Sequence, residues 1–300
     1  MLTPNILKEW VAFYMQQLRF PEDAQGDLLA ALDKICQDGA SFAAVSDIVA
    51  AYAADHACHF TPVLEKVCEL CERLDIHTYV GELLIYLCLA DAMRAHYRAK
   101  GHSEDLFWNA LADLGYKLEE CRLIYGINGS FVGKWFAGFF KLERFALGRL
   151  QFELMALKKE GAYRSQVFPE GTTVINVHIP RTGTRLDHDE VENAYRMARK
   201  FFADAFPKGP AIFNCSSWLL YPWNLEILSP TSNLRAFIQD YEIVRSGDYE
   251  DYSALWRLFD CNYTGNPDDL PQNSSLRRAY AARVKRGEPT GYGVGFFTME

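Results

Sequence analysis

The sequence predicts an α+β protein, in which a helical N-terminal half is followed by a half built from a mixed sheet and covering helices. Two observations carry this prediction. From Asn5 to about Tyr125, apolar residues recur at steps of three and four, the period of a helix with one buried face. After Gly126, β-branched and aromatic runs alternate with helical patterns to the end of the chain.

Length and composition favour two domains with well-filled cores. A chain of 300 residues lies near the upper limit for a single hydrophobic core. Hydrophobic residues make up 49% of the chain and aromatic residues 14%, which is typical of folded rather than disordered proteins. We expect a helical domain over residues 1–135 and a mixed-sheet domain over residues 136–300.

Charge and segment composition argue against several classes of partner. The formal net charge of -8 offers no basic excess to neutralise a nucleic-acid backbone. Lys8, Glu9 and Arg19 interrupt the first apolar stretch, which is unlike a secretion signal, and no run reaches the ~18 apolar residues of a membrane helix. The cysteines lie mostly within helical patterns, which suits free thiols. We therefore expect a cytoplasmic protein that binds neither nucleic acid nor membranes.

In the first half, turn signals separate successive helices. These signals are Phe20-Pro21, Asp38-Gly39, Thr61-Pro62 and Lys100-Gly101. Ser103, which two acidic residues follow, is predicted to cap one further helix. No strand pattern competes with the helical period in this half.

In the second half, strand and helix patterns alternate. The predicted strands are FALGRLQFELMAL, TTVINVHIP, AIFNCSSWLL, SALWRLFD and GYGVGFF. The predicted helices are residues 187–206, residues 232–244 and the segment LRRAYAARVKRG. Asp187 and Glu190 fit a capping box at the start of the first of these helices.

Three segments of the second half carry a resemblance to a known family. They are LERFALGRLQFEL, VINVHIPRTG with the acidic-capped helix after it, and FNCSSWLLYP. The chain resembles bacterial acyltransferase-like proteins, in which a helical N-acyltransferase N-terminal domain precedes a GNAT-like C-terminal domain, GNAT being the general amino-group acetyltransferase fold. The resemblance extends over nearly the whole chain. It implies an acyl-CoA-dependent N-acyltransferase with a small-molecule acyl donor and an amine acceptor.

The resemblance also implies where acyl-CoA binds. GNAT cores open their central strands beside acyl-CoA and seat its pyrophosphate in the turn before the next helix. That turn here is Arg181-Thr182-Gly183-Thr184-Arg185, which combines charge, hydroxyls and a flexible backbone ahead of a helix N-terminus. We expect it to hold acetyl-CoA or another acyl-CoA as co-substrate, without a metal.

An ordinary strand-to-helix connection stays open as the alternative for this turn. The pattern Q/R-x-x-G-x-G/A that is usual in the superfamily is missing from it. In addition, Asp187, Asp189 and Glu190 would repel a diphosphate that approaches the same helix end.

Transfer of an acyl group to an amine needs a base and donors for the oxyanion. His178, at the end of its predicted strand, is the first candidate for the base because imidazole titrates near neutral pH. Its alternative role is to hydrogen-bond a neighbouring carbonyl and fix the turn. Glu153 lies on the polar face of its strand and is a second catalytic candidate. The alternative is a solvated strand face, with Glu153 paired to Arg149 or a lysine.

Further candidates lie in and after the strand AIFNCSSWLL. Tyr221 falls where GNAT enzymes place a tyrosine acid, and its alternative is a partly buried aromatic beside Pro222. Cys215 is a catalytic candidate, and we expect its neighbours to line the substrate cleft; these are Asn214, Ser216, Ser217 and Trp218. With His178 as base, Cys215 or Ser216 would also suit a hydrolase, which stays open as a further interpretation.

A zinc-like spacing occurs in the first half, where Cys68-x-x-Cys71 is followed by His77 and preceded by Cys58-His59. Because CELCERL has a helical pattern and no second such pair completes a tetrahedral site, packed thiols are the preferred interpretation. We expect no metal.

The resemblance implies an acyl-CoA-dependent N-acyltransferase, and with the candidate residues above it predicts a cleft near His178, the turn RTGTR and the strand CSSWLLYP. The alternative from a different class is a non-catalytic descendant of the fold that binds a small ligand or a protein partner through the same cleft.

Overall fold

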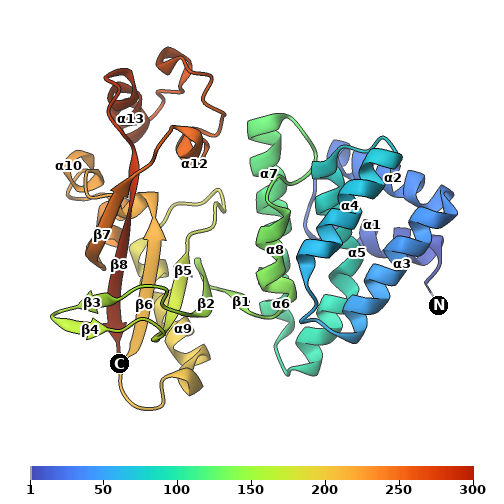
Figure 1. Ribbon diagram of the computed structural model, residues 1–300, viewed down its shortest axis with the longest axis horizontal. Helices are drawn as coiled ribbons and strands as arrows, with labels where there is room; N and C mark the ends of the chain where they lie inside the picture. The colour runs from blue at the N-terminus through green and yellow to red at the C-terminus, as the bar shows by residue number, and fades with distance from the viewer. Residues whose placement is uncertain (1) are drawn as a thin grey trace. The chain divides into compact units, whose positions relative to one another are not determined.

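In the computed structural model, which describes residues 2–300, the chain divides into two compact units between Phe145 and Ala146 (Figure 1). Helices make up the first unit, and the second contains a mixed sheet with covering helices. The predicted fold class is therefore confirmed. Across the described residues, no helix combines the length and the apolar composition that crossing a membrane requires.

The helices of the first unit are α1 (Pro4–Gln17), α2 (Glu22–Gln37), α3 (Gly39–Ala54), α4 (Phe60–Arg73), α5 (Thr78–Ala99), α6 (Glu104–Leu111), α7 (Asp113–Tyr125) and α8 (Gly133–Phe140). Helix α5 packs against α1, α2, α3, α4, α6 and α8, so it forms the centre of this unit. The predicted cap at Ser103 is confirmed, since its hydroxyl accepts a hydrogen bond from the amide of Leu106 at 3.2 Å.

Helix α8 belongs to the first unit, whereas the expected division at residues 135/136 cuts through it. It packs against α4 and α5. The hydroxyl of the buried Tyr52 donates to the carbonyl of Phe140 at 2.8 Å, which ties the end of α8 to α3. These contacts keep α8 with the helices that precede it.

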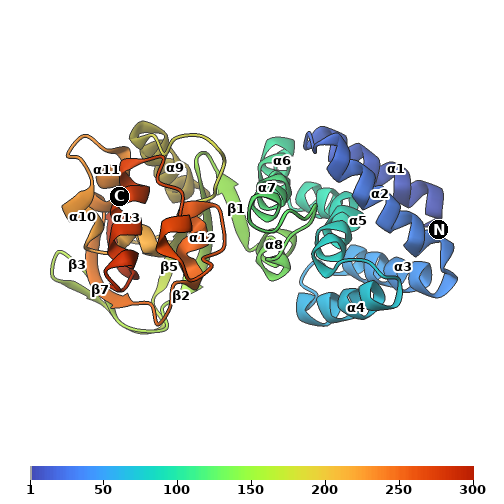
Figure 2. The same ribbon diagram turned by 90° about the horizontal axis from the view of Figure 1, so that it is seen from above.

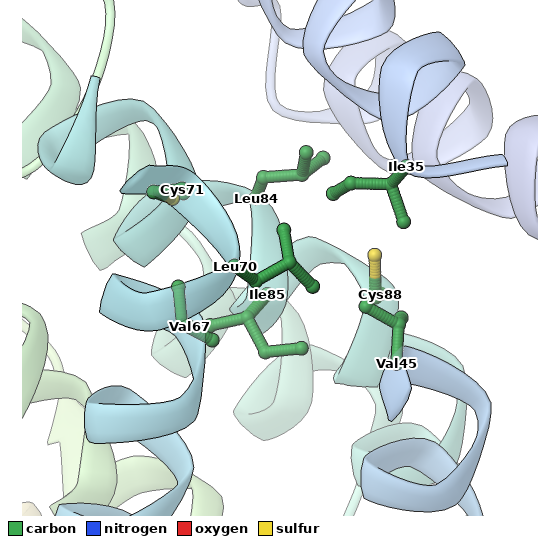
Figure 3. Close-up of a pocket in the computed structure, with 9 residues that line it drawn as sticks. Ile35, Val45, Val67, Leu70, Cys71, Leu84, Ile85 and Cys88 are labelled. Atoms are coloured by element: carbon green, nitrogen blue, oxygen red, sulfur yellow. The ribbon is translucent and has the colours of Figure 1, made fainter. Parts of the chain in front are cut away.

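Figure 3 shows a small cavity among α2, α3, α4 and α5. Its lining residues are Ile35, Val45, Val67, Leu70, Cys71, Gly81, Leu84, Ile85 and Cys88. Its volume of about 10 Å³ holds roughly one water-sized molecule, and its walls offer no hydrogen-bonding partners beyond two thiols. The cavity is a gap in apolar packing. Cys71 of the zinc-like spacing faces it from α4, and all eight cysteines are free thiols.

The second unit contains a six-stranded sheet of order β1-β2-β5-β6-β8-β7 and a separate hairpin, β3–β4. The strands are β1 (Arg144–Leu147), β2 (Leu150–Ala156), β3 (Gly161–Tyr163), β4 (Gln166–Phe168), β5 (Thr173–His178), β6 (Ala211–Ser217), β7 (Glu242–Asp248) and β8 (Gly291–Met299). The α-helices are α9 (His188–Phe201), α10 (Asn224–Ile227), α11 (Asn233–Gln239), α12 (Trp256–Phe259) and α13 (Ser275–Lys285), and the short 3-10 helices include η2 (Trp218–Leu220) and η3 (Ser253–Leu255).

The predicted strand SALWRLFD was wrong, because this segment forms η3 and α12. Leu255 and Phe259, about one helical turn apart, are both buried in a cluster with Tyr280 of α13, so the helical segment packs one face against α13. The strand at this edge of the sheet is instead β7, whose first residues were predicted as the end of a helix. The hairpin β3–β4 was not predicted.

The two faces of the sheet are covered differently. On one face, α9 packs through Tyr195 against Phe152, Phe213 and Phe297, and the last two rings stack at 4.6 Å. On the other face, the hairpin β3–β4 covers one end of the sheet, where Phe168 meets Phe296. Figure 1 shows this hairpin in front of the sheet and α9 behind it. Polar side chains occupy the other end of the sheet face that the hairpin covers.

Alternate glycines in β8 let the chain after β6 pack against the sheet. Gly291, Gly293 and Gly295 occupy the same face of β8, and a Cβ atom on Gly293 would lie 2.1 Å from the carbonyl oxygen of Leu220 in η2. Because that neighbour is backbone, a side chain there cannot be accommodated without moving η2.

We expect Gly293→Ala to lower the free energy of unfolding by roughly 2 kcal/mol or more, because the added methyl group overlaps backbone. Circular dichroism with thermal denaturation measures the change. Gly26→Ala is the matched control, because Gly26 lies in α2 with open space around it and should gain stability. An unchanged midpoint for Gly293→Ala would contradict the close approach of η2 to β8.

Candidate active site

Three polar side chains meet on the part of this sheet face that lies beyond the β3–β4 hairpin, where Glu153 and His178 are partly buried. In the antiparallel ladder of β2 and β5, Glu153 lies opposite Asn176, and Gln151 lies opposite His178. Because side chains alternate along a strand, Glu153, Asn176 and His178 share one face. Nε2 of His178 lies 2.8 Å from Oε1 of Glu153, and the Asn176 amide donates to the same oxygen at 3.1 Å. The structure thus brings together the two first candidates for catalysis.

The Glu153 carboxylate orients the imidazole. When Nε2–H of His178 donates to Glu153, the lone pair of the neutral ring lies on Nδ1. A carboxylate in this position also stabilises the imidazolium that forms when the ring accepts a proton. Asn176 Nδ2, which lies 3.1 Å from His178 Nε2 as well, holds the carboxylate in place. The arrangement suits a general base.

The site lies where two parallel strands part. The described pairs between β5 and β6 are Ile175 with Phe213 and Asn176 with Asn214, and His178 lies beyond them. Asn214 and Ser216 share the face of Asn176, since neighbouring strands present paired residues on the same side. Asn214 is buried and donates to the carbonyl of Gly295 at 3.2 Å, whereas Ser216 is exposed. These strand ends are where the sequence resemblance led us to expect acyl-CoA.

The turn from Arg181 to Arg185 follows β5 directly. Gly183 has a φ of +78°, and the hydroxyls of Thr182 and Thr184 lie 2.8 Å apart. The predicted cap of the next helix is confirmed, since the Asp187 carboxylate accepts hydrogen bonds from the amides of Asp189 and Glu190. The Asp187 carboxylate therefore already occupies two of the first amides of α9. An anion at this end of the helix would instead accept hydrogen bonds from the amides of the turn.

Arg181 is held by the long segment that joins β7 to β8. Its Nε lies 3.0 Å from Oδ1 of Asp260, whose other oxygen lies 2.5 Å from Nη2 of Arg277. Asp260 ends α12 in the left-handed conformation with a φ of +58°. The segment between β7 and β8 therefore fixes the guanidinium of Arg181. The Arg181 side chain stays partly exposed.

Tyr221 lies on the other face of the sheet. Its ring packs over Gly291, on the same face of β8 as Phe297. Its hydroxyl donates to Asp248 at 2.7 Å and accepts from Arg283 at 3.3 Å. Burial and the hydrogen bond to Asp248 raise the pKa of the Tyr221 phenol. Through these two hydrogen bonds, Tyr221 links β7 to α13, which is a structural role.

Cys215 also faces away from His178. Cys215 lies between Asn214 and Ser216 on β6. Because side chains alternate along a strand, its side chain points to the opposite face, into the aromatic core near Tyr195 and Tyr241. Burial raises the pKa of the Cys215 thiol to about 12. A Cys215–His178 pair is not formed, which removes the geometric basis for a cysteine hydrolase.

The remaining predicted cleft residues are Ser217 and Trp218. The Ser217 hydroxyl accepts a hydrogen bond from the amide of Leu219 and caps η2. The Trp218 ring packs edge-on against Tyr280 at 6.1 Å, within the cluster of α12 and α13. Of the four residues, Asn214 and Ser216 share the face of His178.

Sequence reasoning missed three residues of this site. Asn176 is a polar residue in an otherwise apolar strand, two residues before His178 and so on the same face. This spacing is a sequence signal that could have identified it. Arg149 donates three hydrogen bonds to carbonyl oxygens around the turn. Asp260 lies in the segment predicted as a strand, and no sequence pattern links it to Arg181.

Comparison with family models decides the affiliation of the chain. The model of the GNAT-like C-terminal domain matches residues 145–297. The chain belongs to the GNAT-like C-terminal domain family. The model of the N-acyltransferase N-terminal domain matches residues 12–142. The architecture predicted from the sequence resemblance is confirmed.

Solved structures support the same fold for this GNAT-like protein. An acyltransferase in complex with decanoyl-CoA and teicoplanin is 22% identical with a TM-score of 0.71, and the match covers 95% of this chain and 86% of that one. A mutant acyltransferase in complex with octanoyl-CoA is 23% identical with a TM-score of 0.74 and the same coverage. An acyltransferase in complex with CoA and 10C-teicoplanin is 21% identical with a TM-score of 0.68, covering all of both chains. No curated protein sequence matches this chain.

No group of three or more histidine, cysteine, aspartate or glutamate residues in the described part of the chain could hold a metal ion. Cys68 and Cys71 of the zinc-like spacing belong to α4, whose buried face includes Leu64, Val67 and Cys71, whereas Cys58 precedes this helix.

We expect Cys215 to resist alkylation by iodoacetamide at pH 8 in the native protein, because its thiol is buried and its pKa is raised to about 12. Cys36 and Cys261, which are partly exposed, should react first. Mass spectrometry of peptides from native and denatured protein measures this order. Native labelling of Cys215 at the rate of Cys261 would contradict its place in the aromatic core.

Proposed function

We propose that this GNAT-like protein is an acyl-CoA-dependent N-acyltransferase that transfers an acyl group from a CoA thioester to an amine acceptor. The observation that carries the proposal is the Glu153–His178 pair at the diverging ends of β5 and β6, directly before the turn at residues 181–185. Relatives of the same fold bind decanoyl-CoA, octanoyl-CoA or CoA, and two of them bind a teicoplanin. They support a small-molecule donor and acceptor.

His178 acts as the base. It accepts a proton from the amine as the nitrogen attacks the thioester carbonyl, and Glu153 stabilises the resulting imidazolium. The new C–N bond forms a tetrahedral oxyanion, which collapses as the C–S bond breaks. The proton on His178 then returns to the CoA thiolate, so that the products are an amide and CoA. Asn176 keeps Glu153 aligned through this cycle.

The turn from Arg181 to Arg185 holds the diphosphate of CoA. Its amides, the hydroxyls of Thr182 and Thr184 and the guanidinium of Arg185 supply donors, and Asp260 holds Arg181 ready beside them. Asn214 and Ser216 border the acyl group on the β6 side. The eight free thiols support a reducing, cytoplasmic setting for the reaction.

A ligand-binding descendant without transferase activity is the second candidate. The observation that favours it is the Arg181–Asp260 pair, which already neutralises one cation of the proposed diphosphate seat. Such a protein would bind CoA or a similar anion without releasing a free thiol from acyl-CoA.

We expect His178→Asn to reduce the rate of acyl transfer by about 10²–10⁴-fold, and Glu153→Gln by about 10–100-fold, because they remove the base and the group that stabilises its charged form. The variants are assayed by release of free thiol from acyl-CoA in the presence of a panel of amines that includes glycopeptides. Calorimetry should show both variants binding CoA as the parent does.

Glu170→Gln is the matched control for this pair, since Glu170 is exposed between β4 and β5. Parental turnover by His178→Asn would remove His178 from the mechanism. A parent that binds CoA but releases no thiol with any amine would favour the ligand-binding descendant.

A further inference from the structure

One arginine outside the turn contacts the turn from its carbonyl side. Arg149 follows Gly148 in the connection between β1 and β2. Its Nη1 donates to the carbonyl of Pro180 at 3.1 Å, its Nε to that of Arg185 at 3.2 Å, and its Nη2 to that of Thr184 at 3.4 Å. A single planar guanidinium therefore engages carbonyl oxygens at both ends of the turn.

These contacts set the direction of three amide groups. In a trans peptide the C=O and N–H bonds point in opposite directions. The carbonyls of Pro180, Thr184 and Arg185 share their peptide planes with the N–H groups of Arg181, Arg185 and Leu186. With the oxygens turned toward Arg149, these three N–H groups face the other side of the turn. Within residues 2–300, none of the three donates to a protein acceptor.

The amides at the N-terminus of α9 cannot fully replace the turn amides as hydrogen-bond donors to an anion. Asp187 accepts hydrogen bonds from the amides of Asp189 and Glu190, and all three side chains are acidic. An anion next to α9 therefore depends on the turn amides that precede the acidic residues. Their direction is fixed by Arg149 rather than by the helix.

We propose that Arg149 is the positioning residue of the diphosphate seat: by binding the carbonyls of Pro180, Thr184 and Arg185, it presents the amides of Arg181, Arg185 and Leu186 to a diphosphate. The proposal rests on the proposed function and adds a residue to it. Arg149 acts through the backbone of the turn and does not itself contact the ligand.

The test compares two substitutions that separate geometry from charge. Arg149→Met removes the donors and keeps the length of the side chain, whereas Arg149→Lys keeps the charge but cannot reach three carbonyls from one plane. Isothermal titration calorimetry measures the Kd of CoA, dephospho-CoA and inorganic pyrophosphate for each protein. Arg196→Met is the matched control, because Arg196 is exposed on α9 and pairs only with the neighbouring Glu192 in the described residues.

We expect both Arg149 variants to bind CoA and dephospho-CoA at least about tenfold more weakly than the parent, since the loss concerns the diphosphate that both ligands carry. The ratio of the two Kd values should stay unchanged, because the proposed seat binds only the diphosphate, which both ligands share. Parental affinity in Arg149→Lys would show that only the charge matters and would overturn the positioning role. Parental affinity in Arg149→Met would overturn it as well.

A second measurement uses the parent alone and does not depend on the folding of a variant. In ¹⁵N-labelled parent protein, CoA should shift the amide resonances of Arg181, Arg185 and Leu186 more than those of Asp189 and Glu190. CoA binding without these shifts would overturn the inference and leave the proposed function intact. Pyrophosphate binding at these amides without CoA binding would overturn the proposed function alone, and binding of neither would overturn both.

Discussion

The antiparallel register of β2 against β5 is the constraint on which the site depends. It sets Glu153 opposite Asn176 and Gln151 opposite His178, so that the carboxylate, the amide and the imidazole meet on one face. If β2 slipped by one residue, Glu153 and Gln151 would turn toward the aromatic core, away from Asn176 and His178, and Phe152 would move to the polar face. The register is therefore specified by burial on one side and by hydrogen bonding on the other.

The aromatic face holds this register through α9. Tyr195 packs against Phe152, Phe213 and Phe297, which belong to three different strands, so one helix aligns most of the sheet. The same helix begins immediately after the turn at residues 181–185. Packing far from the polar face thus determines where the turn lies relative to His178, and Arg149 determines how the backbone of the turn is directed.

Residues whose position follows from local period could be placed from the sequence. Three such features depend only on a short segment: His178 at a strand end, Glu153 on a polar strand face and the Asp187 cap. In the structure, all three lie where the local pattern predicts them. Tyr221 and Cys215 show the limit of that approach. Position in the chain suggested both, but the face of the sheet that each one occupies depends on register and on the path of η2, which no short segment encodes.

Long-range partners were beyond sequence reasoning for a similar reason. Leu255 and Phe259 would share a face in a strand or in a helix, so their spacing does not distinguish the two; the structure forms η3 and α12 there, packed in a cluster with Tyr280. Asp260, at the end of that helix, pairs with Arg181, which lies 79 residues earlier in the chain. The family resemblance supplied the two-part architecture, which the family models confirm, but it assigned no role to Asn176 or Arg149.

The most direct measurement is a crystal structure of the parent protein with a thioether analogue of acyl-CoA. We predict that the diphosphate lies within hydrogen-bonding distance of the amides of residues 181–186, and that the atom equivalent to the thioester carbonyl lies between the ends of β5 and β6, on the face of His178. An analogue bound on the opposite face of the sheet, or held away from the turn, would contradict the account.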